Sequence, residues 1–435
     1  MKAHRFYFLC PHCQAEESFH DGRCQSCHQP VVFHRKGIRV GNREFTTDAY
    51  YHFLRDHLPV ARPLPEMPNE NPPCDADKLS PLRVSGPVTL YSGDVQFFFR
   101  GYRNWFRRWL VRYRSRAKGR LVIYEDRLCF WGANQCLDWP AENVTCITTD
   151  GHYLELKIRG EPVYHLDFQK ESPLKYELIL QKWLRGWYHR MGKQVVEFQP
   201  RVITTLPRKS ANFRSPDPIQ TRPDFPWTDR FLKSLARRVL RGVLRFWIRV
   251  QVRGAVDLLR SGKGFVIANH QSIMDPFIIG AFLDYQIAFL TKSTSFGSAI
   301  PRAFLRWAMG IPTTRYQRDP VVIRQIHRLL SRGVRVGIFP EGERCWGGGL
   351  QPFKWSVVKL LMQSRQPIYP VIIHGAYQFW PRWASWPSRA SVVLEVNPPF
   401  CLLPDRSLEE QQQFLVSYFQ ERLTQIMHYP TNYTN

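Results

Sequence analysis

The chain has 435 residues, enough to bury two or three cores at roughly 100 to 200 residues per domain. Hydrophobic residues make up 44% of it and aromatic residues 14%, which excludes wholesale disorder. The formal net charge of +25 predicts attraction to a polyanion. Charge alone leaves nucleic acid, an anionic lipid surface and a phosphorylated substrate open.

The start of the chain carries charge and lacks an apolar core, so we expect no secretory signal peptide. We also expect no transmembrane helix, because no run of about 18 uncharged apolar residues occurs. Four of the ten cysteines form two short pairs and the others are scattered, which favours a reducing, cytoplasmic compartment.

Residues 1–58 are predicted to form a small zinc ribbon with a short helix over about 47–57. Two Cys-x-x-Cys pairs stand ten residues apart, a spacing that suits four thiolates closing tetrahedrally on one zinc ion. Four cysteine ligands leave no open coordination position, so the predicted metal is structural. The predicted ligands are Cys10, Cys13, Cys24 and Cys27.

Residues 88–192 are predicted to form a β-rich domain between two proline-rich linkers, 59–87 and 193–227. A predicted amphipathic helix over 173–189 follows the strands. This order of elements resembles a pleckstrin-homology (PH) or GRAM-type domain, and its ligand stays open. The predicted strands are 120–130, 136–139, 144–148, 153–158 and 163–168.

Two segments are predicted to contact an anionic membrane surface. Residues 97–120 interleave aromatic rings with arginines and contain no acidic residue, and residues 229–250 form an amphipathic helix with an arginine-rich face. The alternative for the helix is that its apolar stripe packs on its own domain. Basic and aromatic interleaving also suits single-stranded nucleic acid.

A histidine and an aspartate stand five positions apart after a short apolar run. Residues 264–268 are predicted to form a buried strand, and Asp275 with Pro276 opens the next helix. Ligands bind at this carboxyl edge of open α/β sheets. Asp275 can accept a hydrogen bond from one nitrogen of His270, which leaves the other nitrogen to take a proton from a hydroxyl. We therefore interpret His270 as a general base and Asp275 as its orienting partner.

A second motif, Phe-Pro-Glu-Gly-Glu-Arg over residues 339–344, follows another predicted strand. His-x4-Asp followed by Phe-Pro-Glu-Gly-x-Arg resembles the signature of the lysophospholipid and glycerophosphate acyltransferase family. Residues 311–315 and 368–371 resemble two further blocks of that family. The resemblance covers about residues 228–400. It implies that residues 228–435 form an α/β acyltransferase domain, a mixed sheet flanked by helices.

By this resemblance Arg315, Glu341, Gly342 and Arg344 hold the glycerol phosphate of the acceptor. Arginine donors suit a phosphate, and a carboxylate at 341 can bind a glycerol hydroxyl or orient an arginine. Three positions depart from the family pattern and put the identity of the acceptor in doubt. They are Thr314, Cys345 and Ser356. We interpret Cys345 as a packing residue, since no adjacent base activates it.

The sequence therefore predicts a membrane-associated O-acyltransferase, similar to the 1-acylglycerol-3-phosphate acyltransferases, on the inner face of a membrane. Its expected donor is an acyl-CoA or acyl-ACP (acyl carrier protein) thioester and its acceptor a lysophospholipid, with the acceptor hydroxyl attacking the thioester directly. Two alternatives are a zinc-ribbon nucleic-acid-binding protein and an inactive lipid-binding adaptor. The first leaves the motif blocks unexplained, and the intact His270–Asp275 pair argues against the second. The acceptor, the acyl chain length and the oligomeric state stay open.

Overall fold

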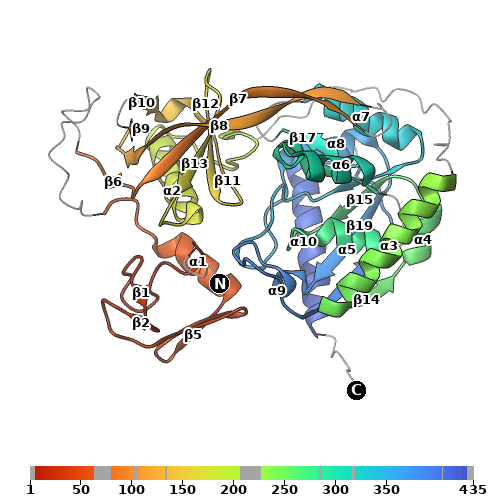
Figure 1. The fold of residues 1–435 in the computed structure, drawn as a ribbon, viewed down its shortest axis with the longest axis horizontal. Helices are drawn as coiled ribbons and strands as arrows, with labels where there is room; N and C mark the ends of the chain where they lie inside the picture. Colours follow the sequence, from red (N-terminus) through yellow and green to blue (C-terminus); the bar gives the residue numbers. More distant parts are fainter. Residues whose placement is uncertain are drawn as a thin grey trace.

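The structure, a computed structural model, describes residues 5–62, 80–101, 106–132, 135–205, 227–283, 287–314, 319–403 and 405–428. Three units follow one another along the chain: a small N-terminal unit, a β-rich middle unit and an α/β unit. Figure 1 shows the first two units stacked on the left and the α/β unit on the right.

The N-terminal unit contains two small antiparallel sheets and one helix. The hydroxyl of Thr46 caps the helix by accepting a hydrogen bond from the Ala49 N–H at 3.1 Å, a favourable role for threonine at this position. The predicted helix over 47–57 is thereby confirmed. The elements are β1 (Phe19–His20), β2 (Arg23–Cys24), β3 (Val31–His34), β4 (Gly37–Val40), β5 (Arg43–Thr46) and α1 (Thr47–His57).

The middle unit is an antiparallel sheet in the order β10-β9-β8-β7-β13-β12-β11, with α2 packed on β11, β12 and β13. Its strands and helix confirm the predicted elements, except that a turn divides the strand expected over 120–130 between β8 and β9. The likeness to a PH or GRAM-type domain stays a prediction. The elements are β6 (Arg83–Val84), β7 (Val88–Arg100), β8 (Arg107–Ile123), β9 (Arg127–Gly132), β10 (Gln135–Pro140), β11 (Val144–Asp150), β12 (Tyr153–Ile158), β13 (Val163–Phe168) and α2 (Pro173–Arg190).

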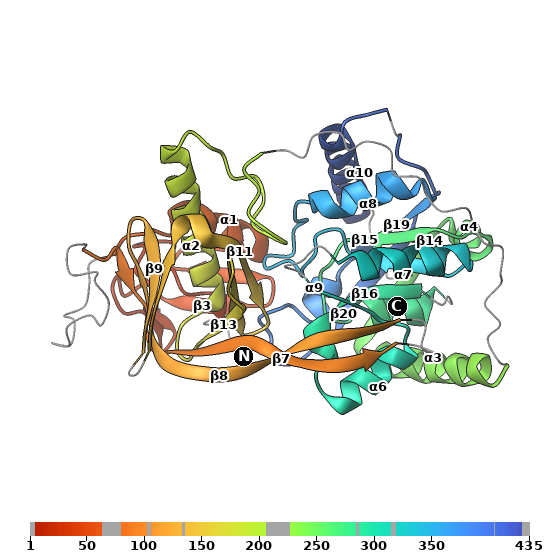
Figure 2. The same cartoon turned by 90° about the horizontal axis from the view of Figure 1, so that it is seen from above.

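A long hairpin of β7 and β8, which we call the arm, leaves the middle unit and lies across the α/β unit (Figure 2). Phe99 and Phe106 are buried against Phe296 of the α/β unit, and Arg108 donates to the Pro312 carbonyl at 2.6 Å and pairs with Asp319. The prediction that residues 97–120 contact a membrane is therefore wrong for Phe99, Phe106 and Arg108, which contact the α/β unit instead. Residues 102–105 lie outside the described part of the chain.

The α/β unit contains a mixed sheet in the order β14-β20-β19-β15-β18-β16-β17. Neighbouring strands are parallel except β19 and β20. The predicted α/β fold is confirmed. Its elements are α3 (Trp227–Trp247), β14 (Ile248–Gly254), α4 (Val256–Ser261), β15 (Phe265–Ala268), α5 (Asp275–Phe282), β16 (Ile287–Lys292), α6 (Ala299–Trp307), β17 (Ile311–Thr313), α7 (Pro320–Ser331), β18 (Arg335–Ile338), α8 (Trp355–Ser364), β19 (Ile368–His374), α9 (Ala376–Phe379), β20 (Ala390–Val396) and α10 (Leu408–His428).

The central strand β15 is buried on both faces, as expected for a strand between two layers of helices. Phe265 and Ile267 face a core formed with α7, α8 and α10, whereas Val266 and Ala268 face a second core formed with α5 and α9. Alternation along β15 thus assigns one core to each face of the sheet. The residue that follows β15 emerges at the carboxyl edge between these layers.

Parts of both predicted linkers pack against folded units. Strand β6 lies within 59–87 and pairs with β8. Within 193–227, Val195 and Phe198 are buried in the core of the middle unit, and Ile147 donates its N–H to the Phe198 carbonyl at 3.2 Å. Residues 206–226 lie outside the described part of the chain.

Candidate active site

His270 lies just beyond the carboxyl end of β15, and Asp275 is the first residue of α5. The Asp275 Oδ2 atom accepts hydrogen bonds from His270 Nδ1 at 2.9 Å and from the N–H groups of Gln271 at 2.6 Å and Ser272 at 2.8 Å. Because a carboxylate accepts, the shared proton resides on Nδ1 and Nε2 carries the imidazole lone pair. The predicted pairing is brought together in the fold.

Neighbouring side chains fix the plane of the His270 ring and the path of the backbone beside it. The Phe339 ring stacks on the imidazole with centroids 4.0 Å apart and planes at 15°. The side chain of Asn269 donates to the Ile373 carbonyl at 2.8 Å and accepts the Ile373 N–H at 2.7 Å. The histidine is therefore held between β18 and β19, which flank β15 in the sheet.

Glu341 joins the two motif loops. Its Oε1 atom accepts the His270 N–H at 2.6 Å and its Oε2 atom accepts the Gln351 N–H at 2.9 Å, and the residue is only 1% exposed. Burial, reinforced by the charges of Asp275 and Glu343, raises the pKa of Glu341 to about 8, although the two N–H donors act in the opposite direction. Both oxygens are directed at backbone, so Glu341 orders the loops rather than lining the cavity.

His270 lines a cavity of about 2020 Å³ that is bounded by both the α/β unit and the middle unit. One set of lining residues is apolar and comes mainly from α5, β16 and α6: Phe277, Ile287, Phe289, Leu290, Phe304, Leu305 and Met309. Another set is basic: Lys157, Arg201, Lys292, Arg344, Lys354, Lys359 and Arg382. Such a lining suits an amphiphile with an acyl chain and an anionic headgroup.

The middle unit places charged residues at this cavity that the sequence analysis did not predict. The Lys292 Nζ atom, at the end of β16, lies 2.5 Å from Asp150 Oδ2 and 2.6 Å from Glu155 Oε1. His165 Nε2 lies 2.6 Å from the same Glu155 oxygen. Asp150 and Lys292 both line the cavity. Their meeting depends on the docking of two units, for which no local sequence signal exists.

The remaining predicted site residues divide into three groups. Gly342 and Arg344 line the cavity, and Gly342 adopts a φ of 74° that favours glycine. Arg315 lies outside the described part of the chain. Burial raises the pKa of the Cys345 thiol well above its ordinary value, and its N–H donates to the His270 carbonyl at 2.9 Å, in agreement with a packing role.

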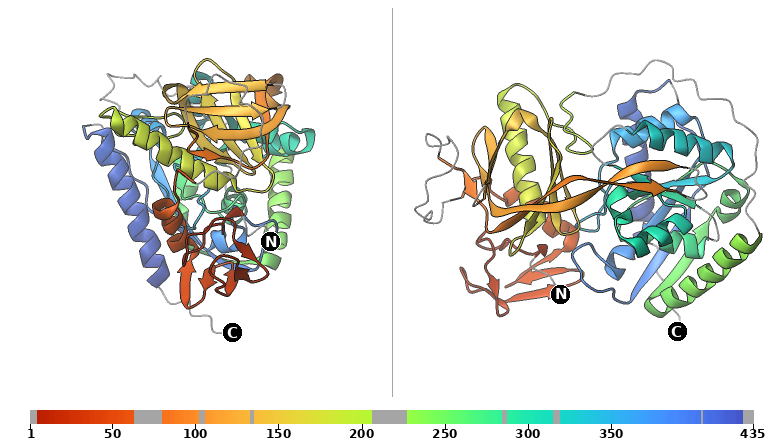
Figure 3. Two further views of the ribbon diagram at one scale, coloured as in Figure 1. Left: turned by 90° about the vertical axis from the view of Figure 1, so that its left-hand side faces the viewer. Right: turned by 45° about the horizontal axis from the view of Figure 1, so that its top comes forward.

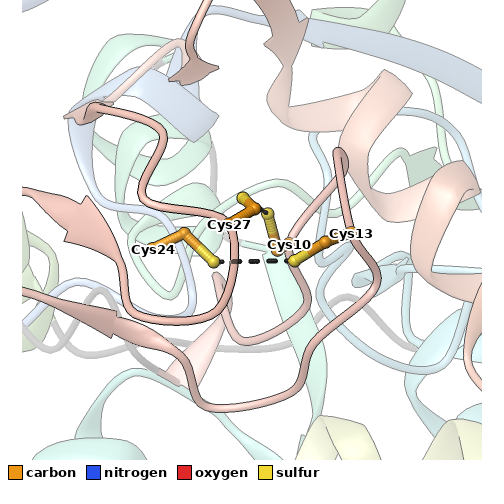
Figure 4. Close-up of side chains that lie close together, drawn as sticks. All are labelled: Cys10, Cys13, Cys24 and Cys27. Atoms are coloured by element: carbon orange, nitrogen blue, oxygen red, sulfur yellow. Dashed lines mark hydrogen bonds between the residues drawn. The ribbon is translucent and has the colours of Figure 1, made fainter.

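The four N-terminal cysteines point toward one another from two loops (Figure 4). The Sγ atoms of Cys10 and Cys27 are 3.8 Å apart, and those of Cys13 and Cys24 are 3.7 Å apart. Thiolates about 2.3 Å from a tetrahedral zinc ion stand about 3.8 Å from one another. The cluster therefore fits a zinc ion.

Known proteins resemble the α/β unit. A family model described as Acyltransferase matches residues 249–374. The 1-acyl-sn-glycerol-3-phosphate acyltransferase alpha of Homo sapiens is 30% identical over 152 residues, which cover 34% of this chain and 54% of the human protein. The 1-acyl-sn-glycerol-3-phosphate acyltransferase of Pseudomonas aeruginosa is 28% identical over 156 residues, 34% of this chain and 58% of that protein.

A solved structure also matches: the 1-acyl-sn-glycerophosphate (LPA) acyltransferase PlsC from Thermotoga maritima, with a TM-score of 0.41 and 22% identity over 47% of this chain and 84% of that chain. The chain spans about half the length of the human and Pseudomonas aeruginosa proteins. The matched segment, residues 249–374, carries His270, Asp275 and Glu341. Residues 249–374 of the chain thus match the acyltransferase family.

Proposed function

We propose that the protein transfers a fatty acyl group from an acyl thioester to the hydroxyl of a lysophospholipid or glycerophosphate-type acceptor. The observation that carries the proposal is the hydrogen bond from His270 Nδ1 to Asp275, which fixes the tautomer of an imidazole that lines a large amphiphilic cavity. A neutral histidine oriented in this way is suited to act as a general base near neutral pH.

The reaction needs no covalent enzyme intermediate. His270 Nε2 takes the proton of the acceptor hydroxyl while that oxygen forms a bond to the thioester carbonyl carbon. The tetrahedral adduct then collapses, the carbon–sulfur bond breaks, and the leaving thiolate recovers the proton from the imidazolium. Asp275 stabilises the imidazolium through the hydrogen bond that its Oδ2 atom accepts from Nδ1, and the N–H groups of Gln271 and Ser272 hold that oxygen in place.

The lining of the cavity and the relatives support the proposed class of acceptor. Arg344 and Lys354 offer cations to a phosphate, and the apolar lining offers space for an acyl chain. The named relatives are 1-acyl-sn-glycerol-3-phosphate acyltransferases, which supports a phosphate-bearing acceptor. Either coenzyme A or an acyl carrier protein is suited to carry the donor thioester.

We also place the protein on the inner face of a membrane, as a peripheral protein. None of the helices in the described part of the chain has the length and hydropathy to cross a bilayer. Helix α3 instead exposes an apolar stripe: Leu235 is 47%, Val239 58%, Val243 57% and Phe246 67% exposed. Exposed arginines flank it, as expected of an interfacial helix on anionic lipid. The side chains of residues 227–233, at the start of this helix, lie outside those described.

The test is acyl transfer by the purified full-length chain, offered mixed lysolipids with acyl-CoA and acyl-ACP, with products identified by mass spectrometry. His270→Ala is expected to lower kcat by about 10²- to 10⁴-fold, because a positioned base is lost. His189→Ala, on an exposed residue at the end of α2, is the matched control. Acyl transfer by His270→Ala at the rate of the unaltered protein would exclude His270 as the general base.

A further inference from the structure

Residues 341–351, which we call the catalytic loop, contact His270 from several directions. Glu341 accepts the His270 N–H, and the Cys345 N–H donates to the His270 carbonyl at 2.9 Å. The side-chain amide of Gln271 donates to the Gly348 carbonyl at 3.3 Å. The position of the histidine backbone therefore depends on the position of this loop.

The other side of the catalytic loop rests on the first turn of α1, which belongs to the N-terminal unit. At Gly347, a Cβ atom would lie 2.9 Å from Tyr51 Cβ, 3.0 Å from Asp48 Cα and 3.1 Å from the Thr47 carbonyl oxygen. At Gly349, a Cβ atom would clash with Asp48 Oδ1 and lie 3.0 Å from Asp48 Cγ. Glycines at these two positions permit the backbone of the loop to press directly on the helix.

The N-terminal unit holds α1 rigidly in that place. The Tyr50 hydroxyl donates to the Leu9 carbonyl at 2.8 Å and accepts the N–H groups of Phe8 at 3.2 Å and Leu9 at 3.0 Å. Tyr50 is fully buried, so these bonds fix the helix to the segment that leads into the first cysteine pair. A helix anchored in this way can hold the loop at Gly347 and Gly349.

Aromatic rings make a second connection between the same two parts. The Phe6 ring stacks parallel to those of Trp346 at 6.5 Å and Trp383 at 6.0 Å between centroids. The indole of Trp383 donates to the Tyr377 hydroxyl at 2.9 Å, and that hydroxyl donates to the Trp346 carbonyl at 2.7 Å. Trp346 is part of the catalytic loop, so the N-terminal unit contacts the loop at Trp346 and at the glycines. Figure 3 shows the N-terminal unit next to the α/β unit, and Figure 1 labels α9, which carries Tyr377, on the side of the α/β unit that faces it.

We propose that the N-terminal unit is a positioning element of the active site, with the first turn of α1 holding the catalytic loop so that Glu341 and His270 keep their reactive arrangement. The inference rests on the proposed acyl transfer for its kinetic readout only. A displacement of the order of 1 Å at a reacting group is enough to cost about 100-fold in rate. The unit therefore controls kcat rather than the affinity for either substrate.

The closing experiment introduces a clash between the catalytic loop and the backbone of α1 in the full-length chain. Gly347→Ala places a methyl group 2.9 Å from Tyr51 Cβ and 3.0 Å from Asp48 Cα, atoms that cannot rotate away, so kcat is expected to fall by about 10-fold or more while KM for the donor stays within about two-fold. Gly186→Ala, on an exposed position of α2 with open space around it, is the matched control.

Hydrogen exchange of the peptide covering residues 341–351 probes the same contact independently of acyl transfer. Faster exchange of this peptide in Gly347→Ala, with unchanged exchange in Gly186→Ala, supports the positioning role. Unchanged exchange and kcat in Gly347→Ala, or a loss of kcat with unchanged exchange of this peptide, overturn it. If the unaltered chain transfers no acyl group, the proposed function fails, and the exchange rates still decide whether α1 positions the loop.

Discussion

Glu341 shows how a single buried carboxylate orders a site. Its two oxygens accept N–H groups on both motif loops, from His270 and Gln351. Glu341→Gln keeps the size of the side chain but turns one oxygen into an NH₂ group that faces an N–H donor. A buried donor left without its partner costs about 1–3 kcal/mol, and we expect a lower melting temperature and a kcat reduced by about 10-fold or more. The melting temperature and kcat of purified Glu341→Gln test this prediction. If both equal the values of the unaltered protein, Glu341 does not order the two loops.

The same variant carries a pH signature. The pKa of Glu341 is raised to about 8 in the folded chain, against about 4.3 for a glutamate in an unfolded chain. Between these values the folded state keeps a proton that the unfolded state releases, so the contribution of Glu341 to stability falls as pH rises. The stability gap between the unaltered chain and Glu341→Gln is therefore expected to narrow from pH 5 to pH 8 in urea titrations. A gap that widens over this interval contradicts the raised pKa.

Sequence reasoning at the scale of residues found His270 and Asp275, the pair that the fold brings together. His270 and Asp275 are linked by five positions at a strand end, a local relation that the chain itself encodes. The role expected for Glu341 differed from its geometry, since a motif specifies a residue type and leaves the direction of the side chain to the fold. Arg382, which pairs with Glu343 at 3.0 Å and lines the cavity, was missed because it lies outside every motif.

At the scale of elements, α3 exposes an apolar stripe that includes Leu235, Val239, Val243 and Phe246. Serine at Val239, Val243 and Phe246 is expected to weaken binding to anionic vesicles by about 10-fold or more, because burial of each apolar side chain contributes about 1.5–3 kcal/mol. Folding is expected to survive, since each of the three is more than half exposed. Sedimentation with vesicles of phosphatidylserine and phosphatidylcholine is the measurement. Met191→Ser, an exposed change on the middle unit, is the control, and undiminished binding by the triple variant excludes α3 as the contact.

An amphipathic stripe does not say whether it faces protein or lipid, which is why the sequence left both readings of α3 open. The predicted C-terminal end of α3 was also wrong, because the helix was expected to reach residue 250 but ends at Trp247. Residues 248–254 continue its arginine-rich pattern, yet they form β14, because they pair in parallel with β20 more than a hundred residues later. The arm is a similar case: its buried half is explained by Phe296 and Asp319, far away in the chain.

At the scale of the whole molecule, the N-terminal and middle units share one hydrophobic core, which also includes Trp346 and Trp383 of the α/β unit. Glu16, between the two cysteine pairs, accepts a two-pronged ion pair from Arg83 at 2.9 and 2.8 Å, and Lys175 lies 2.9 Å from the same carboxylate. Linkers and cysteine spacing predicted separate domains along the chain. Their shared hydrophobic core depends on contacts between distant segments, which composition and periodicity do not reveal.

This shared core predicts that loss of the metal is felt far from the cysteines. We expect one zinc ion per chain in purified protein, measured by elemental analysis, and its removal by a chelator to lower the melting temperature by about 10 °C or more, since structural zinc contributes its binding energy to folding. Without zinc, the loop that carries Glu16 is no longer closed, and its ion pair with Arg83 loses the geometry that stabilises it; breaking such a buried pair costs about 3–5 kcal/mol. Cys13→Ser is expected to reproduce the effect, whereas Cys401→Ser, on an exposed cysteine outside the cluster, leaves zinc content and melting unchanged. Full zinc content and an unaltered melting temperature in Cys13→Ser would show that the four thiolates do not close on a metal, and that the common core is stable through its apolar contacts and ion pairs alone.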